Sequence, residues 1–413
     1  MGKGARLRVD CPCVVPRSMR LTKVRVTKLF GLFAHEIPLN REERITIIHG
    51  PNGFGKTIVL RMLAALCSRN YDLFREVPFK TFTIQFDDGR CLTVTAVIEA
   101  DSEFAAAFGP NIDLQFRISH PRASEPIDSQ AGVVEKPKKG EVSKLLAEGP
   151  VVRLVRTQRL DVEQHDEQVE LGASALKPTV VAYSEELAAQ MRLTLAEYAT
   201  RSQEFDRTFP VRLLSHTKSE PLAAEELRKR MAGLEQKRAT LMRLGFLEPE
   251  PGLEQASVQA IETKRDVLSV YVDDMESKLS VFDEMASKVQ LFKRIINERF
   301  LFKRLEIHRD QGFVFTSDTG AQLRPSALSS GEQHELILFY ELLFKLQKNA
   351  LVLIDEPEIS LHVAWQEKFL GDLMEVVRLS EIDVVVATHS PEIIGEHWNL
   401  TVELKGPSEL HKG

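Results

Sequence analysis

Two acidic residues, Asp355 and Glu356, directly follow the apolar run Leu351 to Ile354. The run is short and uninterrupted, which predicts a strand buried on both faces. Carboxylates at the end of such a strand are costly unless a cation or a reacting group meets them. In this Walker B arrangement, Asp355 could hold Mg²⁺, directly or through water, and Glu356 could orient and deprotonate a water aimed at a γ-phosphate. Taken alone, the segment is equally well explained as a strand end with two solvated acids.

A glycine-rich segment nearer the N-terminus supplies a matching phosphate site. Residues 50–57 follow the apolar run 45–48 and precede a helical pattern, which is the context that G-x-x-x-x-G-K-[ST] requires. The glycines let backbone N–H groups turn toward phosphate oxygens, and the helix N-terminus adds partial positive charge. Lys56 would reach the β- and γ-phosphates of ATP, and the Thr57 hydroxyl would ligate Mg²⁺. The residues predicted to contact nucleotide here are Gly50, Pro51, Asn52, Gly53, Phe54, Gly55, Lys56 and Thr57.

Two more polar residues follow strand-like runs and are candidate catalytic residues. Gln158 comes after a β-rich run and could both ligate Mg²⁺ and position the attacking water. Gln85 and Gln115 are rivals for this role that we interpret as strand residues. His389 follows another buried-strand pattern, at the edge where open α/β sheets bind ligands, and could hydrogen-bond a γ-phosphate.

A third phosphate-binding candidate is the sequence ALSSGEQ at 327–333, which opens a helix predicted over 334–347. Two serines and a glycine at a helix N-terminus form an anion site. Taken alone, the segment is a capped helix that could bind an anion. The residues assigned to nucleotide contact are Ser329, Ser330, Gly331 and Glu332.

Composition and patterning place these motifs in a large α/β chain of 413 residues. Strand patterns cover 20–28 and three runs within 81–118, and an irregular loop is expected over 119–149. We divide the chain into a disordered N-terminus, the N-terminal lobe of an ATPase head, a helical insertion and the C-terminal lobe of the head. The respective ranges are 1–18, 19–183, 184–300 and 301–413. Met19 is an alternative start of the protein, since ordered sequence begins right after it.

The insertion is predicted to be helical, beginning at Ser184, which two acids follow. Apolar residues recur in it at intervals of seven: Ile261, Leu268, Met275, Phe282, Val289 and Ile296. This repeat favours a coiled coil or a tight helical hairpin. An ordinary helix packed on a globular core is the alternative.

Net charge and cysteine usage exclude several classes of protein. The formal net charge is −6, so the chain lacks the strongly basic character that would by itself indicate nucleic-acid binding. No apolar run is long enough for a membrane span. The four cysteines complete no metal-ligand pattern, and we expect reduced thiols and a cytoplasmic location.

The chain has, in order, Walker A at 50–57, a signature at 327–333, Walker B at 351–356, a D-loop at 357–362 and a switch histidine at His389. This order resembles ABC-class ATPases, which implies a P-loop head of mixed sheet with an antiparallel subdomain. A helical arm between Walker A and the signature is similar to the SMC/RecF-like branch. The segments LSSGEQHELIL, LIDEPEISLHVAWQEKFL and VVVATHSPEIIG resemble ATPases of bacterial anti-phage systems, including Septu and retron-associated ones, and the ATPase half of OLD-family nucleases. The resemblance covers about 20–110 and 150–405. It is strong at the five motifs and weak in the arm.

Two departures limit what the resemblance implies. Ser330 stands where many signatures have glycine, and little sequence follows His389, so no Toprim domain is expected and nuclease chemistry is not carried over. The resemblance implies ATP and Mg²⁺ as cofactors and slow ATP hydrolysis. It also implies a homodimer, or a higher assembly built from it, in which each nucleotide lies between Lys56 of one subunit and Ser329 to Gly331 of the other.

Three functions are compared on this basis. The first is a defence ATPase that controls a separately encoded effector, which the lack of an effector site in the sequence favours. The second is a RecF- or SMC-like DNA repair or maintenance ATPase with duplex DNA as its partner, which the acidic net charge disfavours. The third, a transporter ATPase, is disfavoured because residues 58–326 separate Walker A from the signature, far more than transporters need.

Overall fold

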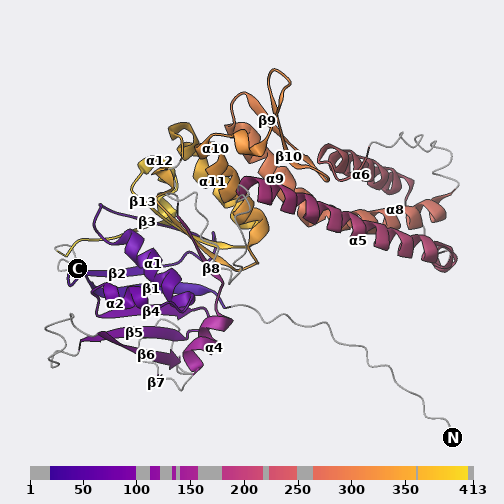
Figure 1. Cartoon of the computed structure of the whole chain (residues 1–413). Helices are drawn as coiled ribbons and strands as arrows, with labels where there is room; N and C mark the ends of the chain where they lie inside the picture. The colour runs from indigo at the N-terminus through magenta and orange to yellow at the C-terminus, as the bar shows by residue number, and fades with distance from the viewer. Residues whose placement is uncertain are drawn as a thin grey trace, which may run out of the picture. The chain divides into compact units, whose positions relative to one another are not determined.

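The structure is a computed structural model of the chain, and it describes residues 19–98, 112–120, 133–135, 140–156, 179–216, 223–248, 264–359 and 361–407. The chain forms two compact units, which are described separately (Figure 1). Unit 1 comprises 1–157, 347–359 and 381–413, and unit 2 comprises 158–346 and 360–380. The predicted α/β fold is confirmed, whereas the four-part division of the chain stays a prediction. The described residues include no helix both long and apolar enough to cross a membrane.

Unit 1 contains a five-stranded sheet in which every pairing is parallel. In sheet order its strands are β14 (Thr401–Glu403), β3 (Ile45–His49), β13 (Asp383–Thr388), β12 (Leu351–Asp355) and β8 (Val152–Arg156). The apolar run of β12 is buried, as predicted for a strand covered on both faces. Asp355 pairs with Ala387, and Thr388 pairs with His49. The carboxyl ends of β3, β13 and β12 therefore meet at one edge of the sheet.

The second sheet of unit 1 is antiparallel and six-stranded. In sheet order its strands are β2 (Phe33–Pro38), β1 (Leu21–Leu29), β4 (Thr81–Phe86), β5 (Cys91–Ile98), β6 (Ile112–His120) and β7 (Val133–Glu135). The strands predicted over 20–28 and within 81–118 are confirmed. Gln85 and Gln115 lie in β4 and β6, as the interpretation of both as strand residues required.

The loop predicted over 119–149 is wrong for part of its length. Strand β6 continues to His120, and α4 (Glu141–Glu148) is a helix. The helix buries Leu145 and Leu146 in the core of unit 1. With Val142, these leucines have the i, i+3, i+4 spacing of an apolar helix face, a local signal that the loop prediction missed. Eight residues are too few for a helix that is stable alone, so burial against the core stabilises it.

Helix α1 (Lys56–Cys67) lies between the two sheets and supplies much of the core of unit 1. Its buried Leu63 and Leu66 join one apolar cluster with Phe82 of the antiparallel sheet and with Leu353 and Val385 of the parallel sheet. Burying leucine-sized side chains stabilises a fold by about 1.5–3 kcal/mol each. The cluster therefore fixes the helix that begins at the glycine-rich loop. Two short helices, α2 (Asp72–Glu76) and α12 (Pro391–Ile394), complete the unit together with the 3₁₀ turns η4 (Pro357–Ile359) and η5 (Trp398–Leu400).

Unit 2 is mainly helical. Its helices are α5 (Thr179–His216), α6 (Ala224–Arg243), α8 (Arg265–Leu279), α9 (Asp283–Arg299), α10 (Ser330–Tyr340) and α11 (Val363–Ser380). The 3₁₀ turns η1 (Ser280–Phe282) and η2 (Pro325–Ala327) and the π-helical turn η3 (Glu341–Lys345) connect some of them. Strands β9 (Lys303–His308), β10 (Gly312–Ser317) and β11 (Gln322–Leu323) form a small antiparallel sheet.

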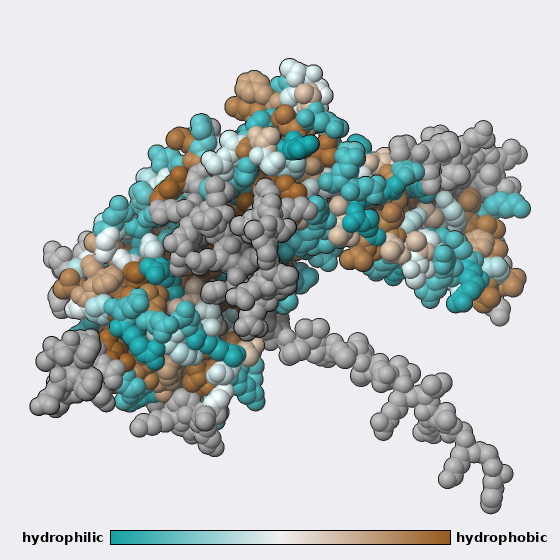
Figure 2. Space-filling view, in the orientation of Figure 1, coloured by the Kyte–Doolittle hydropathy of each residue, from teal (hydrophilic) through white to brown (hydrophobic). Residues whose placement is uncertain are grey.

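The predicted helical arm is confirmed, and it consists of α5, α6 and α8 (Figure 1). Of the seven-residue row, Met275, Phe282, Val289 and Ile296 are buried, and Ile261 lies outside the described residues. The Phe282 ring packs against Tyr198 of α5 at 5.0 Å between centroids. On the visible face of the arm, hydrophilic residues are interspersed with hydrophobic ones (Figure 2). Exposed apolar side chains on α5 are Leu193, Val211 and Leu214.

The helix start predicted at Ser184 is wrong, because Ser184 lies inside α5. Its buried hydroxyl accepts a hydrogen bond from Phe313 N at 2.7 Å and donates one to Gln311 O at 3.2 Å. The side chain that looked like a helix cap therefore holds the turn between β9 and β10. A serine can serve either role, and its local sequence does not distinguish them.

A buried ion cluster connects three helices of unit 2. Arg299 at the end of α9 pairs with Glu335 of α10 and, at 2.7 Å, with Asp372 of α11. Burial raises the pKa of Glu335 to about 7, although Arg299 opposes the shift. These ion pairs therefore connect α9, the helix that follows the arm in the chain, to α10, the helix that begins within the signature sequence.

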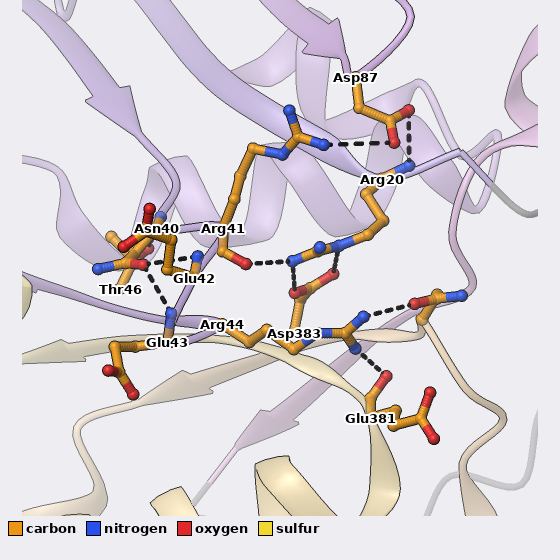
Figure 3. Close-up of polar contacts among 11 residues, drawn as sticks. Arg20, Asn40, Arg41, Glu42, Glu43, Arg44, Thr46, Asp87, Glu381 and Asp383 are labelled. Carbon is orange, nitrogen blue, oxygen red and sulfur yellow. Dashed lines mark hydrogen bonds and ion pairs between the residues drawn. The ribbon is translucent and has the colours of Figure 1, made fainter.

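The two sheets of unit 1 are tied together by an ion pair at the edge opposite the strand ends described above. Arg20 binds both carboxylate oxygens of Asp383, Nε to Oδ2 at 2.8 Å and Nη2 to Oδ1 at 2.5 Å (Figure 3). Arg20 precedes β1, and Asp383 begins β13. Beside them, Arg44 donates to Asn349 Oδ1 at 2.9 Å. Bidentate pairs of this kind are the stronger class of charge-assisted hydrogen bond.

We expect Arg20→Ala to lower the free energy of unfolding by about 1–3 kcal/mol, because both partners are mostly buried and Asp383 would lose its cation. Chemical unfolding followed by tryptophan fluorescence and circular dichroism measures the change. Arg41→Ala is the matched control, since the half-exposed Arg41 lies 3.8 Å from Asp87 and should contribute little. Equal stability of the two variants would contradict the role given to the Arg20 pair.

Candidate functional site

The glycine-rich loop connects β3 to α1 and has a backbone that side chains would obstruct. Gly50, Gly53 and Gly55 have φ values of 151°, 87° and 86°. A Cβ on Gly55 would lie 2.6 Å from Leu29 Cδ2. The residue preceding α1 is Gly55, and no side chain caps the helix there. The first backbone N–H groups of α1 are thus left to bind an anion.

Lys56 is the cation of this loop. Its side chain is buried, and Nζ donates to Gly50 O at 2.6 Å and to Pro51 O at 3.2 Å. Burial lowers the pKa of Lys56, and the nearby carboxylates of Glu356, Glu358 and Asp355 oppose that shift. A buried ammonium folded over backbone carbonyls can exchange these partners for phosphate oxygens.

The loop meets the end of β12 through one hydrogen bond. Thr57 Oγ1 donates to Asp355 Oδ1 at 3.0 Å. Burial raises the pKa of Asp355, with Thr57 opposing and Glu356 and Glu358 adding to the rise. A hydroxyl and a carboxylate are oxygen ligands that Mg²⁺ prefers. The donor set therefore fits Mg²⁺.

Glu356 leaves the strand in a left-handed backbone conformation, with φ of 47°. Its backbone N–H still donates to Ala387 O of β13 at 2.8 Å. The left-handed region costs a non-glycine residue roughly 1–2 kcal/mol. Retaining such strain at a strand end is characteristic of functional sites.

His389 follows β13 and is oriented by a residue that the sequence interpretation did not select. Its Nδ1 lies 2.9 Å from Glu358 Oε1, and the same oxygen accepts from the His389 backbone N–H at 2.9 Å and from Thr388 Oγ1 at 2.8 Å. The Glu358 side chain is 7% exposed and that of His389 is 46% exposed. The sequence PEIS contains this glutamate at position 358, but its contact with His389 is formed only in the folded structure.

His35 is a second residue that the sequence interpretation missed. It lies on β2, is buried, and shares a 2.8 Å hydrogen bond between Nε2 and Phe54 O of the glycine-rich loop. Its ring stacks on Phe33, which in turn contacts the Phe54 ring. Burial lowers the pKa of His35, and the Phe54 carbonyl opposes the shift. The antiparallel sheet thus supports the loop from one side.

The signature residues lie in unit 2, at the start of α10. Ser329 is the N-cap: its hydroxyl accepts from Glu332 N at 3.4 Å, and Ser329 N donates to Glu332 Oε2 at 2.8 Å. Lys303 of β9 binds both Glu332 carboxylate oxygens at 2.7 Å. Although burial opposes it, Lys303 and Ser329 together lower the pKa of Glu332. Ser330 and Gly331 form the first helical turn, as a capping box arranges them.

The structure therefore brings together Lys56, Thr57, Asp355, Glu356 and His389 in unit 1, at the edge where β3, β12 and β13 end. The signature residues belong to unit 2. Gln158 lies outside the described residues. The nucleotide, metal and catalytic roles assigned to all these residues stay predictions.

Together the fold and the glycine-rich loop define an α/β P-loop ATPase. Residues 45–395 match the family described as "AAA domain, putative AbiEii toxin, Type IV TA system", and the chain belongs to this family. No curated protein matches the chain.

Among solved structures, the chain is similar to the SMC head domain with an extended coiled coil from Pyrococcus furiosus, bound to the C-terminal domain of ScpA. The identity is 14%, the TM-score is 0.34, and 94% of each chain is covered. It is also similar to the SMC head domain from Thermotoga maritima, at 12% identity, a TM-score of 0.37 and 91% coverage of each chain. Likeness at this level is too distant to transfer function.

We expect acidification to destabilise the wild-type protein more than it destabilises the His35→Gln variant. Folded His35 stays neutral because its pKa is lowered, whereas the unfolded chain takes up a proton below the ordinary value of 6.5. Stability is therefore lost as the pH falls from about 6.5 toward the folded pKa. Glutamine can still donate to Phe54 O but does not titrate. Thermal unfolding between pH 5 and 8 measures the difference, with exposed His308→Gln as the control. Parallel profiles for wild type and His35→Gln would contradict the prediction.

Proposed function

We propose that this protein binds ATP and Mg²⁺ at the P-loop of unit 1, hydrolyses ATP slowly, and uses the nucleotide to hold two copies together. The observation that carries the proposal is the Thr57–Asp355 contact of 3.0 Å at the start of α1. It joins the loop that would cradle phosphates to the carboxylate that would hold the metal.

The residues divide the chemistry between them. Lys56 and the N–H groups of residues 53–57 would bind the β- and γ-phosphates, while Thr57 and Asp355 would hold Mg²⁺. Bound Mg²⁺ supplies neutralisation of charge on the phosphates. Glu356, which follows β12 in a left-handed backbone conformation, would orient the attacking water and accept its proton. His389 would hydrogen-bond the γ-phosphate, and Gln158 is a further candidate for positioning the water.

Pairing of two copies is supported by the signature residues. Ser329, Ser330, Gly331 and Glu332 present a capped helix start in unit 2. In the proposed dimer this start contacts the nucleotide held by the other copy, which makes ATP part of a two-fold interface. Hydrolysis then opens the dimer. The Arg299–Glu335 pair is the contact through which the arm would respond, since it connects α9 to α10.

We further propose that the dimer controls a separately encoded effector in a bacterial defence system. The family description names a toxin and a Type IV TA system, which supports a role of this class. Among the described residues no cluster of three or more His, Cys, Asp or Glu side chains could hold a metal ion of an effector site. The chemistry that the described residues support is nucleotide hydrolysis.

The test separates nucleotide binding from hydrolysis with two variants. Glu356→Gln should bind ATP as tightly as wild type but release phosphate at least about 100-fold more slowly, because the base is lost and the loop is intact. Lys56→Ala should weaken ATP binding at least about 10-fold, because a charged phosphate contact is removed. Calorimetry measures binding, and a phosphate-release assay measures turnover.

Glu36→Gln is the matched control, since Glu36 is an exposed residue of β2 that pairs with Lys23. It should keep both binding and turnover. Wild-type turnover in Glu356→Gln, or wild-type affinity in Lys56→Ala, would overturn the assignment of the site.

A further inference from the structure

Glu358 is a buried acid next to the site for which the proposed chemistry gives no role. It lies in the 3₁₀ turn η4, directly after β12, and its side chain is 7% exposed. Its Oε1 accepts three hydrogens, from Thr388 Oγ1 at 2.8 Å, from the His389 backbone N–H at 2.9 Å and from His389 Nδ1 at 2.9 Å. All three donors belong to the end of β13 and the residue after it.

The contact fixes the chemical form of the His389 ring. A carboxylate accepts hydrogen bonds and cannot donate them, so the nitrogen that faces it carries the hydrogen. Nδ1 is therefore the protonated nitrogen, and Nε2 lies on the opposite side of the ring. Because the ring is 46% exposed, Nε2 can exchange protons with solvent. A free imidazole has no such constraint on its tautomer or its orientation.

We propose that Glu358 is a positioning residue that holds His389 with Nε2 turned outward and prepares it to donate to an anion. The proposal rests on the proposed function, in which that anion is the γ-phosphate. With Nδ1 bonded to the Glu358 carboxylate, donation to the phosphate uses a hydrogen on Nε2. That proton is taken from solvent as the phosphate binds and returns to solvent when the phosphate leaves.

A purely structural role for Glu358 is the competing explanation. The same carboxylate binds Thr388 and the His389 backbone N–H, and these contacts alone could hold the end of β13. The two roles differ in one respect. If Glu358 positions His389, its substitution has an effect only when the His389 side chain is present. If its role is purely structural, the effect is the same with or without that side chain. A double-mutant comparison therefore separates them.

The kinetic test uses Glu358→Gln, which keeps the shape of the side chain and removes its charge. We expect kcat to fall about tenfold with the KM for ATP changed less than about threefold, because the interaction acts on the transition state. In a His389→Asn background the same change should have no further effect on kcat. Glu392→Gln is the matched control, since Glu392 of α12 accepts from Ser390 Oγ, next to His389, and its loss should leave kcat unchanged. Unchanged kcat in Glu358→Gln, or an equal fall in the His389→Asn background, would overturn the proposal.

The second test needs no ATP hydrolysis. Nitrogen-15 NMR of labelled histidines reports which ring nitrogen is protonated, and the signal lost in His389→Asn assigns the residue. Wild type should show His389 protonated at Nδ1, and Glu358→Ala should show a mixture of tautomers. The same Nδ1–H tautomer in both proteins would refute the positioning role. If Glu358→Ala does not fold, the kcat values of Glu358→Gln in the wild-type and His389→Asn backgrounds decide between a positioning and a structural role. Absence of ATPase activity in wild type refutes the proposed function instead, and leaves the tautomer measurement valid.

Discussion

Thr57 and Asp355 are 298 positions apart in the sequence, yet their side chains meet at 3.0 Å because of how the parallel sheet is ordered. β3 and β12 flank β13, so the helix that follows β3 can start beside the end of β12. Parallel strands require long crossover connections, and here those connections contain the arm and the small sheet of unit 2. The strand order thus places the Thr57 hydroxyl, which lies in the helix after β3, against the Asp355 carboxylate at the end of β12.

This arrangement concentrates negative charge at one edge of the sheet. Asp355, Glu356 and Glu358 are three acids within the four positions 355–358, and burial raises the pKa of Asp355. Lys56 lies at the end of the glycine-rich loop. Burial lowers its pKa, and the three carboxylates oppose that shift. Such a site is costly by itself, and in the proposed function bound Mg²⁺ would supply the missing positive charge. The apolar cluster around α1 offsets that cost in the absence of ligand.

Local patterns in the sequence predicted the helix start that carries Thr57 and the strand ends at Asp355 and His389, because glycine spacing and short apolar runs extend over only a few residues. The partners of these residues were not predictable in the same way. Glu358 meets His389, and His35 meets the glycine-rich loop, only through the packing of distant strands. In helix α4 the spacing of Val142, Leu145 and Leu146 does give a local signal, but a helix of eight residues depends on burial against the core for its stability. Apart from this helix, the features that sequence reasoning missed are contacts at long sequence separation, which leave no local signature.

We propose that ATP holds two copies of this protein together across the site. The most direct measurement is the mass of Glu356→Gln by light scattering, with and without ATP and Mg²⁺, at nucleotide concentrations where calorimetry shows the site to be filled. The account predicts a monomer without nucleotide and a dimer, or a larger assembly built from dimers, with it. A mass that does not change when the site is filled would contradict the account, since the signature residues at Ser329 would then not bind nucleotide across an interface.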